Sequence, residues 1–396
     1  MMLEICDGWD KFDPGTLDPE AIREIILRLS SLPLLFTVSI CQYRPKYNIP
    51  FGLFHNLRDL IVREGATIDD VPSVIANSSH LVNLSIDHGL HLDSNFNLSV
   101  LHVISLFNKF PRGQFSNVQA LDLSGLCVDL LSSSIPSLIP HLRHLTDLSI
   151  WGFVLPAVFW DYLCDANIHL ECLSLNPCEV GPALAHYLSS FSGLRRLYIS
   201  LQKPSDRSEY AEMHPSWFLR VIQIHALHLT GVHILPSVPG SWCLSELIIG
   251  HLLLCINLRS ISVRVDNDSA RVKGSKNVVQ QLIRCLHIWN SLRWLEIKAV
   301  ADGSDHPSYY WGIPGYLLRN TLAAYCLRPT AAMLQMNLKT DLAELHMRQH
   351  PLESDKYAFR PQHLTFAGSK AAKEQKKGPM LDGDDEVESI MFKLVR

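Results

Sequence analysis

The pattern L-x-x-L-x-L, with Val or Ile allowed in place of Leu, occurs four times in one stretch of the chain: VQALDL at 118–123, LTDLSI at 145–150, LECLSL at 170–175 and LRRLYI at 194–199. The first residues of these copies are 27, 25 and 24 positions apart. The L-x-L part alternates with a period of two, which predicts a strand with one buried face. One such strand cannot bury its apolar face alone, so we expect the copies to pair side by side over a shared core.

The segments between the copies carry apolar residues at helical spacing. These residues are Phe159, Tyr162, Leu163 and Ala166, and then Leu184, Tyr187 and Leu188. A strand followed by a helix, repeated in register, predicts an α/β fold with a curved parallel sheet inside and helices outside. A doubly wound α/β domain is the alternative, but its strands are continuous apolar runs and its loops carry glycines for a ligand. No G-x-G-x-x-G motif occurs in the chain.

Further copies extend the pattern in both directions. Three precede the central stretch, as LFTVSI at 35, LRDLIV at 57 and LVNLSI at 81, and three follow it, as IHALHL at 224, LRSISV at 258 and LRWLEI at 292. LSELII at 244 starts only 14 residues before the copy at 258, so we predict that it is not a repeat strand. The stretch Leu98–Phe110 is predicted to be helical and to end at Pro111.

The pattern divides the chain into four predicted segments. Residues 1–18 form an irregular leader, and residues 19–300 form the repeat domain, which begins with a capping helix at 19–30. Residues 301–366 form a C-terminal cap with degenerate strands at 342–347 and around 363. Residues 367–396 are expected to be a charged, disordered tail.

Composition excludes several classes of protein. The net charge of −4 argues against bulk electrostatic binding to nucleic acid or to a membrane. The first residues lack the apolar core of a secretory signal, and the longest apolar stretches are too short to span a bilayer. The ten cysteines form no C-x-x-C pair, and those in apolar segments, such as Cys164, Cys172 and Cys285, are predicted to be buried free thiols. We therefore expect an intracellular protein of the cytoplasm or nucleus.

Motifs of catalytic and cofactor chemistry are absent from the sequence. It contains no P-loop, nucleophile elbow, zinc-protease helix or kinase signature. Two histidine pairs at a spacing of three, His141 with His144 and His225 with His228, are interpreted as ordinary surface or partly buried residues rather than metal ligands. The sequence therefore predicts no cofactor, no metal and no catalysis.

The concave face of the predicted sheet remains as the candidate functional surface. The third, fifth and seventh residues of each unit point to this face. Acidic residues concentrate there before position 150 and basic residues after position 195. We predict that a protein partner binds at Asp122, Asp147, Trp151, Asn176, Arg196, Tyr198, His228, Arg264 and Trp294. Aromatic and arginine side chains are typical of binding hot spots, which favours this selection.

The repeats resemble those of intracellular leucine-rich-repeat proteins, and specifically of the F-box type that is numerous in mushroom-forming fungi. The resemblance rests on the copies themselves, on the sequences that lead into them (FSNVQAL, PHLRHL and FSGLRRL) and on Cys178, which stands where the repeat signature has a Cys. It implies a curved solenoid. In that family an N-terminal F-box binds the adaptor of a cullin-type ubiquitin ligase, and the repeats hold the substrate. Here a repeat strand already begins at 35, so the helix at 19–30 is interpreted as part of the first repeat.

Two hypotheses for function follow. The first is a non-catalytic scaffold that binds a protein partner on its concave face, in the role of substrate receptor that the resemblance implies, with a ubiquitin-ligase adaptor as a second partner. The second is an enzyme with a site on an inserted loop, either 202–215 or 301–315.

Overall fold

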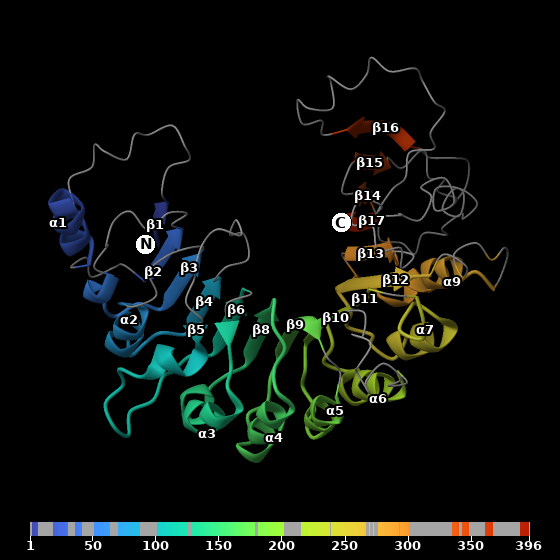
Figure 1. Ribbon diagram of the computed structural model, residues 1–396. Coiled ribbons are helices and arrows are strands. Elements are labelled where there is room, and N and C mark those ends of the chain that lie inside the picture. The colour runs from blue at the N-terminus through green and yellow to red at the C-terminus, as the bar shows by residue number, and fades with distance from the viewer. Residues whose placement is uncertain are drawn as a thin grey trace. The chain divides into compact units, whose positions relative to one another are not determined.

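The structure is a computed structural model of the 396-residue chain. It describes residues 2–6, 19–30, 36–41, 51–63, 70–87, 101–125, 128–178, 181–201, 215–237, 239–266, 269, 272, 276–292, 294–300, 335–339, 343–347, 361–366 and 389–395. The chain divides into two compact units, Met1–Pro177 with Gly181–Phe191, and Cys178–Val180 with Ser192–Arg396. Each unit combines a parallel sheet with helices, so the predicted mixed α/β class is confirmed (Figure 1).

The first unit contains a sheet of parallel strands that pair in the order of the chain. The strands are β1 (Met2–Cys6), β2 (Thr37–Cys41), β3 (Asp59–Arg63), β4 (Asn83–Asp87), β6 (Ala120–Ser124), β8 (Asp147–Trp151) and β9 (Cys172–Cys178). Each of the six predicted copies in this unit forms a strand that begins at its third residue. Strand β1 lies within the segment that was expected to be an irregular leader.

The register of this sheet matches the sequence pattern residue by residue. The central leucines of neighbouring copies face one another, since Leu121 pairs with Leu148 and Leu148 pairs with Leu173. All three side chains are buried, whereas the residues on either side of each are partly exposed. The predicted phase of these strands is therefore confirmed.

The helices of the first unit follow its strands and cover one face of the sheet, where they bury the alternate apolar residues (Figure 1). They are α1 (Pro19–Ser30), η2 (Phe51–Leu53), α2 (Val71–Asn77), η4 (Val103–Phe107), η5 (Ser132–Ser134), α3 (Ile135–Leu138), η6 (Ile139–Leu142), α4 (Ala157–Asp165) and α5 (Pro182–Ser189). Helices α4 and α5 are in contact, and the rings of Trp160 and Tyr187 lie 5.6 Å apart between them. The predicted helix 19–30 is confirmed by α1.

One backbone arrangement recurs at the start of the strands. The carbonyl oxygen of the second residue in one copy accepts hydrogen bonds from the second and third residues of the next copy. For example, the carbonyl of Gln119 accepts from Thr146 at 2.8 Å and from Asp147 at 2.9 Å. The carbonyl of Arg195 accepts in the same way from Thr230 and Gly231, at 2.7 and 3.1 Å. This bond pattern marks Thr230 as the second residue of a copy.

The second unit corrects the predicted copy at 224. Ile224 and His225 belong to helix α6 (Ser216–His225), and the next strand is β11 (Gly231–Pro236). The copy therefore starts at Leu229, and the prediction at 224 is wrong. The other elements of the repeat region in this unit are β10 (Arg196–Leu201), α7 (Glu246–Leu252), β12 (Ser260–Val265), α9 (Val278–Arg284), η9 (Cys285–Ile288) and β13 (Trp294–Ala299). The exclusion of 244 as a strand is confirmed, since this segment leads into α7.

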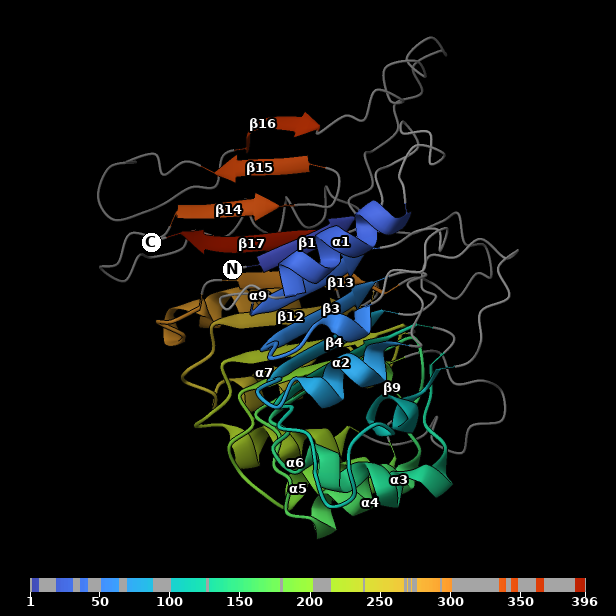
Figure 2. The ribbon, with the colours of Figure 1, turned by 90° about the vertical axis from the view of Figure 1, so that its left-hand side faces the viewer.

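Four antiparallel strands complete the second unit. Strand β17 (Ser389–Val395) pairs with β13 and with β14 (Gln335–Lys339), and β15 (Ala343–Met347) pairs with β14 and β16 (Pro361–Phe366). Their alternating directions are visible in Figure 2. Strands β15 and β16 coincide with the two degenerate strands predicted at 342–347 and around 363. Strand β14 also lies within the predicted cap, and β17 lies within the segment that was expected to be a disordered tail. The other residues of these two segments lie outside the described residues.

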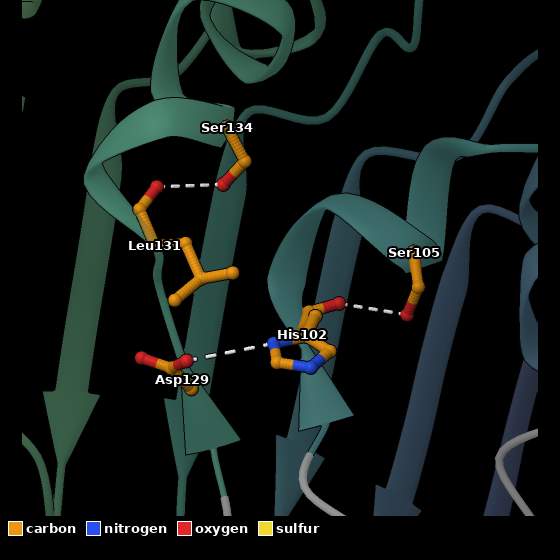
Figure 3. Close-up of polar contacts among 5 residues, drawn as sticks. All are labelled: His102, Ser105, Asp129, Leu131 and Ser134. Atoms are coloured by element: carbon orange, nitrogen blue, oxygen red, sulfur yellow. Dashed lines mark hydrogen bonds and ion pairs between the residues drawn. The ribbon is translucent and has the colours of Figure 1, made fainter.

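A small second sheet corrects the helix predicted at 98–110. Leu101 and His102 form strand β5, which pairs with β7 (Val128–Asp129) and leads into the 3-10 helix η4. After each strand a serine hydroxyl donates a hydrogen bond to the carbonyl oxygen three residues earlier. Ser105 donates to His102 and Ser134 donates to Leu131, each at 2.7 Å (Figure 3). His102 Nδ1 also lies 3.5 Å from Asp129 Oδ2. Both side chains are nearly half exposed to solvent, so this pair contributes little to stability.

The five cysteines whose side chains the structure describes carry free thiols, but not all of them are buried. Cys243 and Cys255 lie in the core, where burial raises the pKa of the thiols to about 11 and about 12. Cys164, Cys172 and Cys285 are only partly buried, so the prediction of burial was wrong for these three. Cys164 lies on α4 and Cys172 is the first residue of β9, and the side chains of both are partly exposed to solvent.

Gly152 directly follows strand β8 with a φ of +90°, in the region that disfavours side chains. A Cβ atom at this position would lie 3.0 Å from the backbone oxygen of Gly125. We expect Gly152→Ala to lower the free energy of unfolding by at least about 1–2 kcal/mol, because the left-handed conformation is strained for alanine. Gly250→Ala is the matched control, since Gly250 lies exposed in α7 with no atom near its would-be Cβ. Equal stability of the two variants in chemical denaturation would contradict this expectation.

His141 is a buried histidine of the first unit. Its Nδ1 accepts a hydrogen bond from the backbone N–H of Ser116 at 3.3 Å, and its ring stacks on Phe107 at 4.9 Å. Burial holds the pKa of His141 below its usual value of 6.5. Below this pH the unfolded chain therefore binds more protons at this site than the folded chain does, and stability falls.

We expect the free energy of unfolding to decrease as the pH is lowered from about 7.5 to about 5.5, and part of this decrease to vanish in His141→Asn. Chemical denaturation at several pH values measures the free energy of unfolding of the unaltered chain and of the His141→Asn variant. Identical pH profiles for the two proteins would show that His141 does not titrate differently on unfolding.

Candidate functional site

The candidate surface is the sheet face opposite the helices, which we call the open face of each unit. In the first unit the third residues of the copies form one row, the fifth residues a second and the seventh residues a third, because the register pairs equal positions. The rows read Thr37, Asp59, Asn83, Ala120, Asp147 and Cys172; Ser39, Ile61, Ser85, Asp122, Ser149 and Ser174; and Asp87, Ser124, Trp151 and Asn176. Nearly all of these side chains are partly exposed.

Carboxylates on the open face of the first unit are held by hydroxyl and amide donors. Thr37 Oγ1 donates to Asp59 at 2.8 Å, and the side-chain amide of Asn83 donates to the same carboxylate. Ser85 Oγ donates to Asp122 Oδ2 at 3.1 Å. These hydrogen bonds fix the side chains of the two carboxylates in place on this face.

Asp147 and Trp151 lie on the same strand, β8. Thr146 Oγ1 donates to the carboxylate of Asp147 at 2.9 Å. The indole N–H of Trp151 donates to Ser149 Oγ at 3.0 Å, which fixes the ring along the strand rather than away from the sheet. Trp151 is half-buried and pairs with Asn176 of β9 in the seventh-residue row. The ring is thus an ordered aromatic surface beside an amide side chain.

The second unit has two complete rows on its open face. Arg196, Gly231, Ser260 and Trp294 form the third-residue row, and Tyr198, His233, Ser262 and Glu296 form the fifth-residue row. Ser262 and Glu296 are buried despite their position on this face, and the Ser262 hydroxyl donates to Glu296 Oε2. Burial of a carboxylate requires such a partner, because an unpaired charge away from water is costly.

Further contacts join the residues of these two rows. The rings of Tyr198 and His233 lie 5.6 Å apart, and His233 Nε2 lies 3.1 Å from Ser260 Oγ. The pKa of Tyr198 is raised by burial and, to a smaller degree, by the charge of Glu296, while Arg264 acts in the opposite direction. Arg264 also donates from Nη1 to the carbonyl oxygen of Pro236 at 2.9 Å. The polar side chains of four neighbouring strands therefore form one connected cluster.

The predicted site residues divide between the two units. Asp122, Asp147, Trp151 and Asn176 lie on the open face of the first unit, and Arg196, Tyr198, Arg264 and Trp294 lie on strands β10, β12 and β13 of the second. His228 is the exception, because it is exposed in the turn between α6 and β11 and not on a strand. Its assignment to the sheet face was wrong.

His233 takes the sheet position that was assigned to His228. It is the fifth residue of the copy that begins at Leu229, whose apolar positions Leu229, Val232 and Ile234 are all buried. The sequence 224–235 contains two overlapping matches to the pattern, and the one with β-branched residues is the strand. A preference for Val and Ile in strands could have distinguished them.

Loops that were considered as carriers of an enzymatic site lie outside the described residues, apart from Pro215. Within the described ranges, no three His, Cys, Asp or Glu side chains are grouped so that they could hold a metal ion. Among the helices in those ranges, none has the length and apolar character needed to cross a bilayer.

A scan against protein-family models found no match to this chain, and a search of curated proteins found no similar sequence.

Proposed function

We propose that this chain is a non-catalytic leucine-rich-repeat solenoid whose open face binds a protein partner. The observation that carries the proposal is the residue-by-residue register of the copies, which aligns polar and aromatic side chains in rows on a face without helices. Strand-and-helix units that stack in register are typical of solenoids, and their sheet faces are used as extended binding surfaces. Trp151 and Tyr198 are partly exposed aromatic residues on such faces, as at binding hot spots.

The proposed biological role is substrate recognition for a cullin-type ubiquitin ligase, on the strength of the sequence resemblance. In that role the open face holds the protein to be modified, and a ligase adaptor is a second partner. The long, irregular spacing of the copies and the sequences that lead into them support this role. The proposal assigns no catalytic residue to the chain.

Photo-cross-linking of the full chain tests which face binds. A photoreactive phenylalanine derivative is placed at Ser174, on the open face of β9, and as a matched control at Asp161, exposed on α4 among the helices. We expect protein adducts from position 174 and not from position 161. Adducts at 161 alone would contradict open-face binding. Mass spectrometry of co-purified proteins tests the ligase role, which requires adaptor and cullin peptides.

A further inference from the structure

Apolar side chains are exposed on neighbouring turns of the second unit, where α6 and α7 lead into β11 and β12. Leu227 and Ile256 are 69% and 56% exposed. They stand two residues before Leu229 and Leu258, the first residues of successive copies, so they occupy the same position in adjacent turns. The side-chain amide of Asn257 donates to the carbonyl oxygen of Leu227 at 2.8 Å, which holds the two turns together.

Helix α7, which contacts α6 on one side and α9 on the other, adds an apolar stripe beside these turns (Figure 1). Leu247, Gly250 and Leu254 are three and seven positions apart, so they lie on one side of the helix and of the turn that continues it. Leu247 and Leu254 are 51% and 47% exposed. Ile288 of η9 is also exposed, and the indole N–H of Trp289 next to it donates to the last carbonyl oxygen of α7 at 3.3 Å. The apolar edge, as we call this surface, consists of Leu227, Leu247, Gly250, Leu254, Ile256 and Ile288.

The repeat itself does not require apolar residues at these turns. At the position of Leu227 and Ile256, two residues before the first residue of a copy, the first unit exposes the polar residues His55, Ser79 and Arg143. An apolar side chain in water contributes nothing to the stability of the fold, because only surface removed from water does so. Contiguous exposed apolar surface is typical of a site where another molecule binds.

Gly250 is a second and independent indication of a docking surface. Glycine inside a helix is destabilising relative to alanine. The fold of this chain does not require a glycine at this position, since no atom lies within 4 Å of its would-be Cβ and its φ is not positive. A glycine on the exposed side of α7 does allow the backbone of another segment to approach the helix closely.

The charges around the apolar edge favour an acidic partner. From the first residue of α6, α7 and α9 to the strand that follows each helix, the chain contains four arginines and one acidic residue, Glu246. Glu246 accepts a hydrogen bond from the side-chain amide of Gln281 at 2.6 Å. Arg220 and Arg259 are exposed, and neither forms an ion pair with an acidic side chain in the part of the chain that the structure describes.

We infer that the apolar edge binds an amphipathic helix of a second protein, with leucine-like residues along one side and acidic residues on its flanks. Neighbouring copies are about 4.8 Å apart in the sheet, and residues i and i+4 of a helix are about 5–6 Å apart, so successive anchors of such a helix can contact successive turns. Its acidic flank lies near Arg220 and Arg259, and its backbone approaches α7 at Gly250. This surface is formed by helices and turns, so it is separate from the open face and goes beyond the proposed function.

The test uses the full chain and fluorescently labelled peptides of about 18 residues, which is long enough to form a helix. One peptide consists of leucine, alanine and glutamate, with the leucines at every third or fourth position, and the second has lysine in place of every glutamate. A third has the composition of the first, with its leucines distributed around the helix. We expect the first peptide to bind at least about tenfold more tightly than either of the others in fluorescence polarisation.

Variants of the chain identify the surface that binds. Leu227→Ser combined with Ile256→Ser is expected to weaken binding of the glutamate peptide at least about tenfold, because it removes two apolar anchors. Gly250→Gln is expected to weaken binding without lowering the melting temperature, because the added side chain enters open space that the peptide would occupy. Arg259→Gln is expected to reduce the preference for the glutamate peptide over the lysine peptide. Leu131→Ser is the matched control and should leave affinity unchanged, because Leu131 is 47% exposed but belongs to the first unit.

Two results would overturn the inference directly: equal affinities of the glutamate and lysine peptides for the unaltered chain, and full affinity in the Leu227→Ser, Ile256→Ser variant. Binding of the chain to vesicles of anionic phospholipid, without binding of the glutamate peptide, would assign the apolar edge to a membrane surface and overturn it too. So would self-association of the chain in sedimentation that this double variant abolishes, if the glutamate peptide does not bind.

Discussion

Leu173→Ala is expected to lower the free energy of unfolding by about 2–5 kcal/mol, the range for leucine-to-alanine changes in protein cores. Leu173 is 1% exposed, pairs with Leu148 of the neighbouring strand and points toward the helix-covered face. Its removal leaves a cavity between the sheet and the helices, and the close packing of regular copies gives the neighbours little freedom to fill it. Urea or guanidinium denaturation of the purified chain measures the loss.

Ser174→Ala is the matched control one residue further along the same strand. Ser174 lies on the open face and is partly exposed, so we expect its replacement to change stability by less than about 0.5 kcal/mol. The contrast between adjacent residues depends only on which face each side chain occupies. If both variants lose stability to the same extent, the alternation of buried and open faces in β9 is not as the structure has it.

The architecture was predictable because the same short-range rule repeats. A strand of period two with leucine on one face needs only its own sequence to be recognised, and regular spacing places the copies in one register. Leu121, Leu148 and Leu173 therefore pair as the alignment of copies predicts. The helix 19–30 was equally accessible, since Pro19 and an acidic first turn are local signals.

The errors arose where two local interpretations compete. Ile224 and His225 match the strand pattern, but they are also the last turn of an amphipathic helix, and tertiary packing decides between them. His225 is fully buried and accepts a hydrogen bond from the backbone N–H of Leu194 at 3.2 Å, which ties the helix to the preceding copy. A long-range bond of this kind leaves no trace in the local sequence.

The chemistry of the open face was only partly predictable for a related reason. The sequence shows which residues point outward, but it does not show their partners on neighbouring strands. Ser262 and Glu296 are buried together, and His233 contacts Ser260, because strands 27 or more residues apart in the chain are adjacent in the sheet. The lack of room for a side chain at Gly231 likewise comes from both neighbouring strands, through Ser260 and Arg196.

Trp151→Ala and Tyr198→Ala are each expected to weaken binding of the protein partner by at least about 2 kcal/mol, the threshold for a hot-spot residue. Each ring is half-buried on the open face of its own unit and is held by a neighbour: Trp151 by its hydrogen bond to Ser149, and Tyr198 by its contact with His233. An aromatic surface that is already ordered loses little entropy on binding, so its removal is costly.

The affinity of each variant for the partner recovered by cross-linking is measured by calorimetry, with a melting curve to confirm that the chain remains folded. Tyr162→Ala is the control, because Tyr162 is also partly exposed but lies on α4, on the helix-covered side. We expect this control to leave affinity unchanged. Loss of affinity in Tyr162→Ala, with full affinity in Trp151→Ala and Tyr198→Ala, would move the binding surface from the open face to the helices, since a partner that docks on the helix layer would not sense either open-face ring.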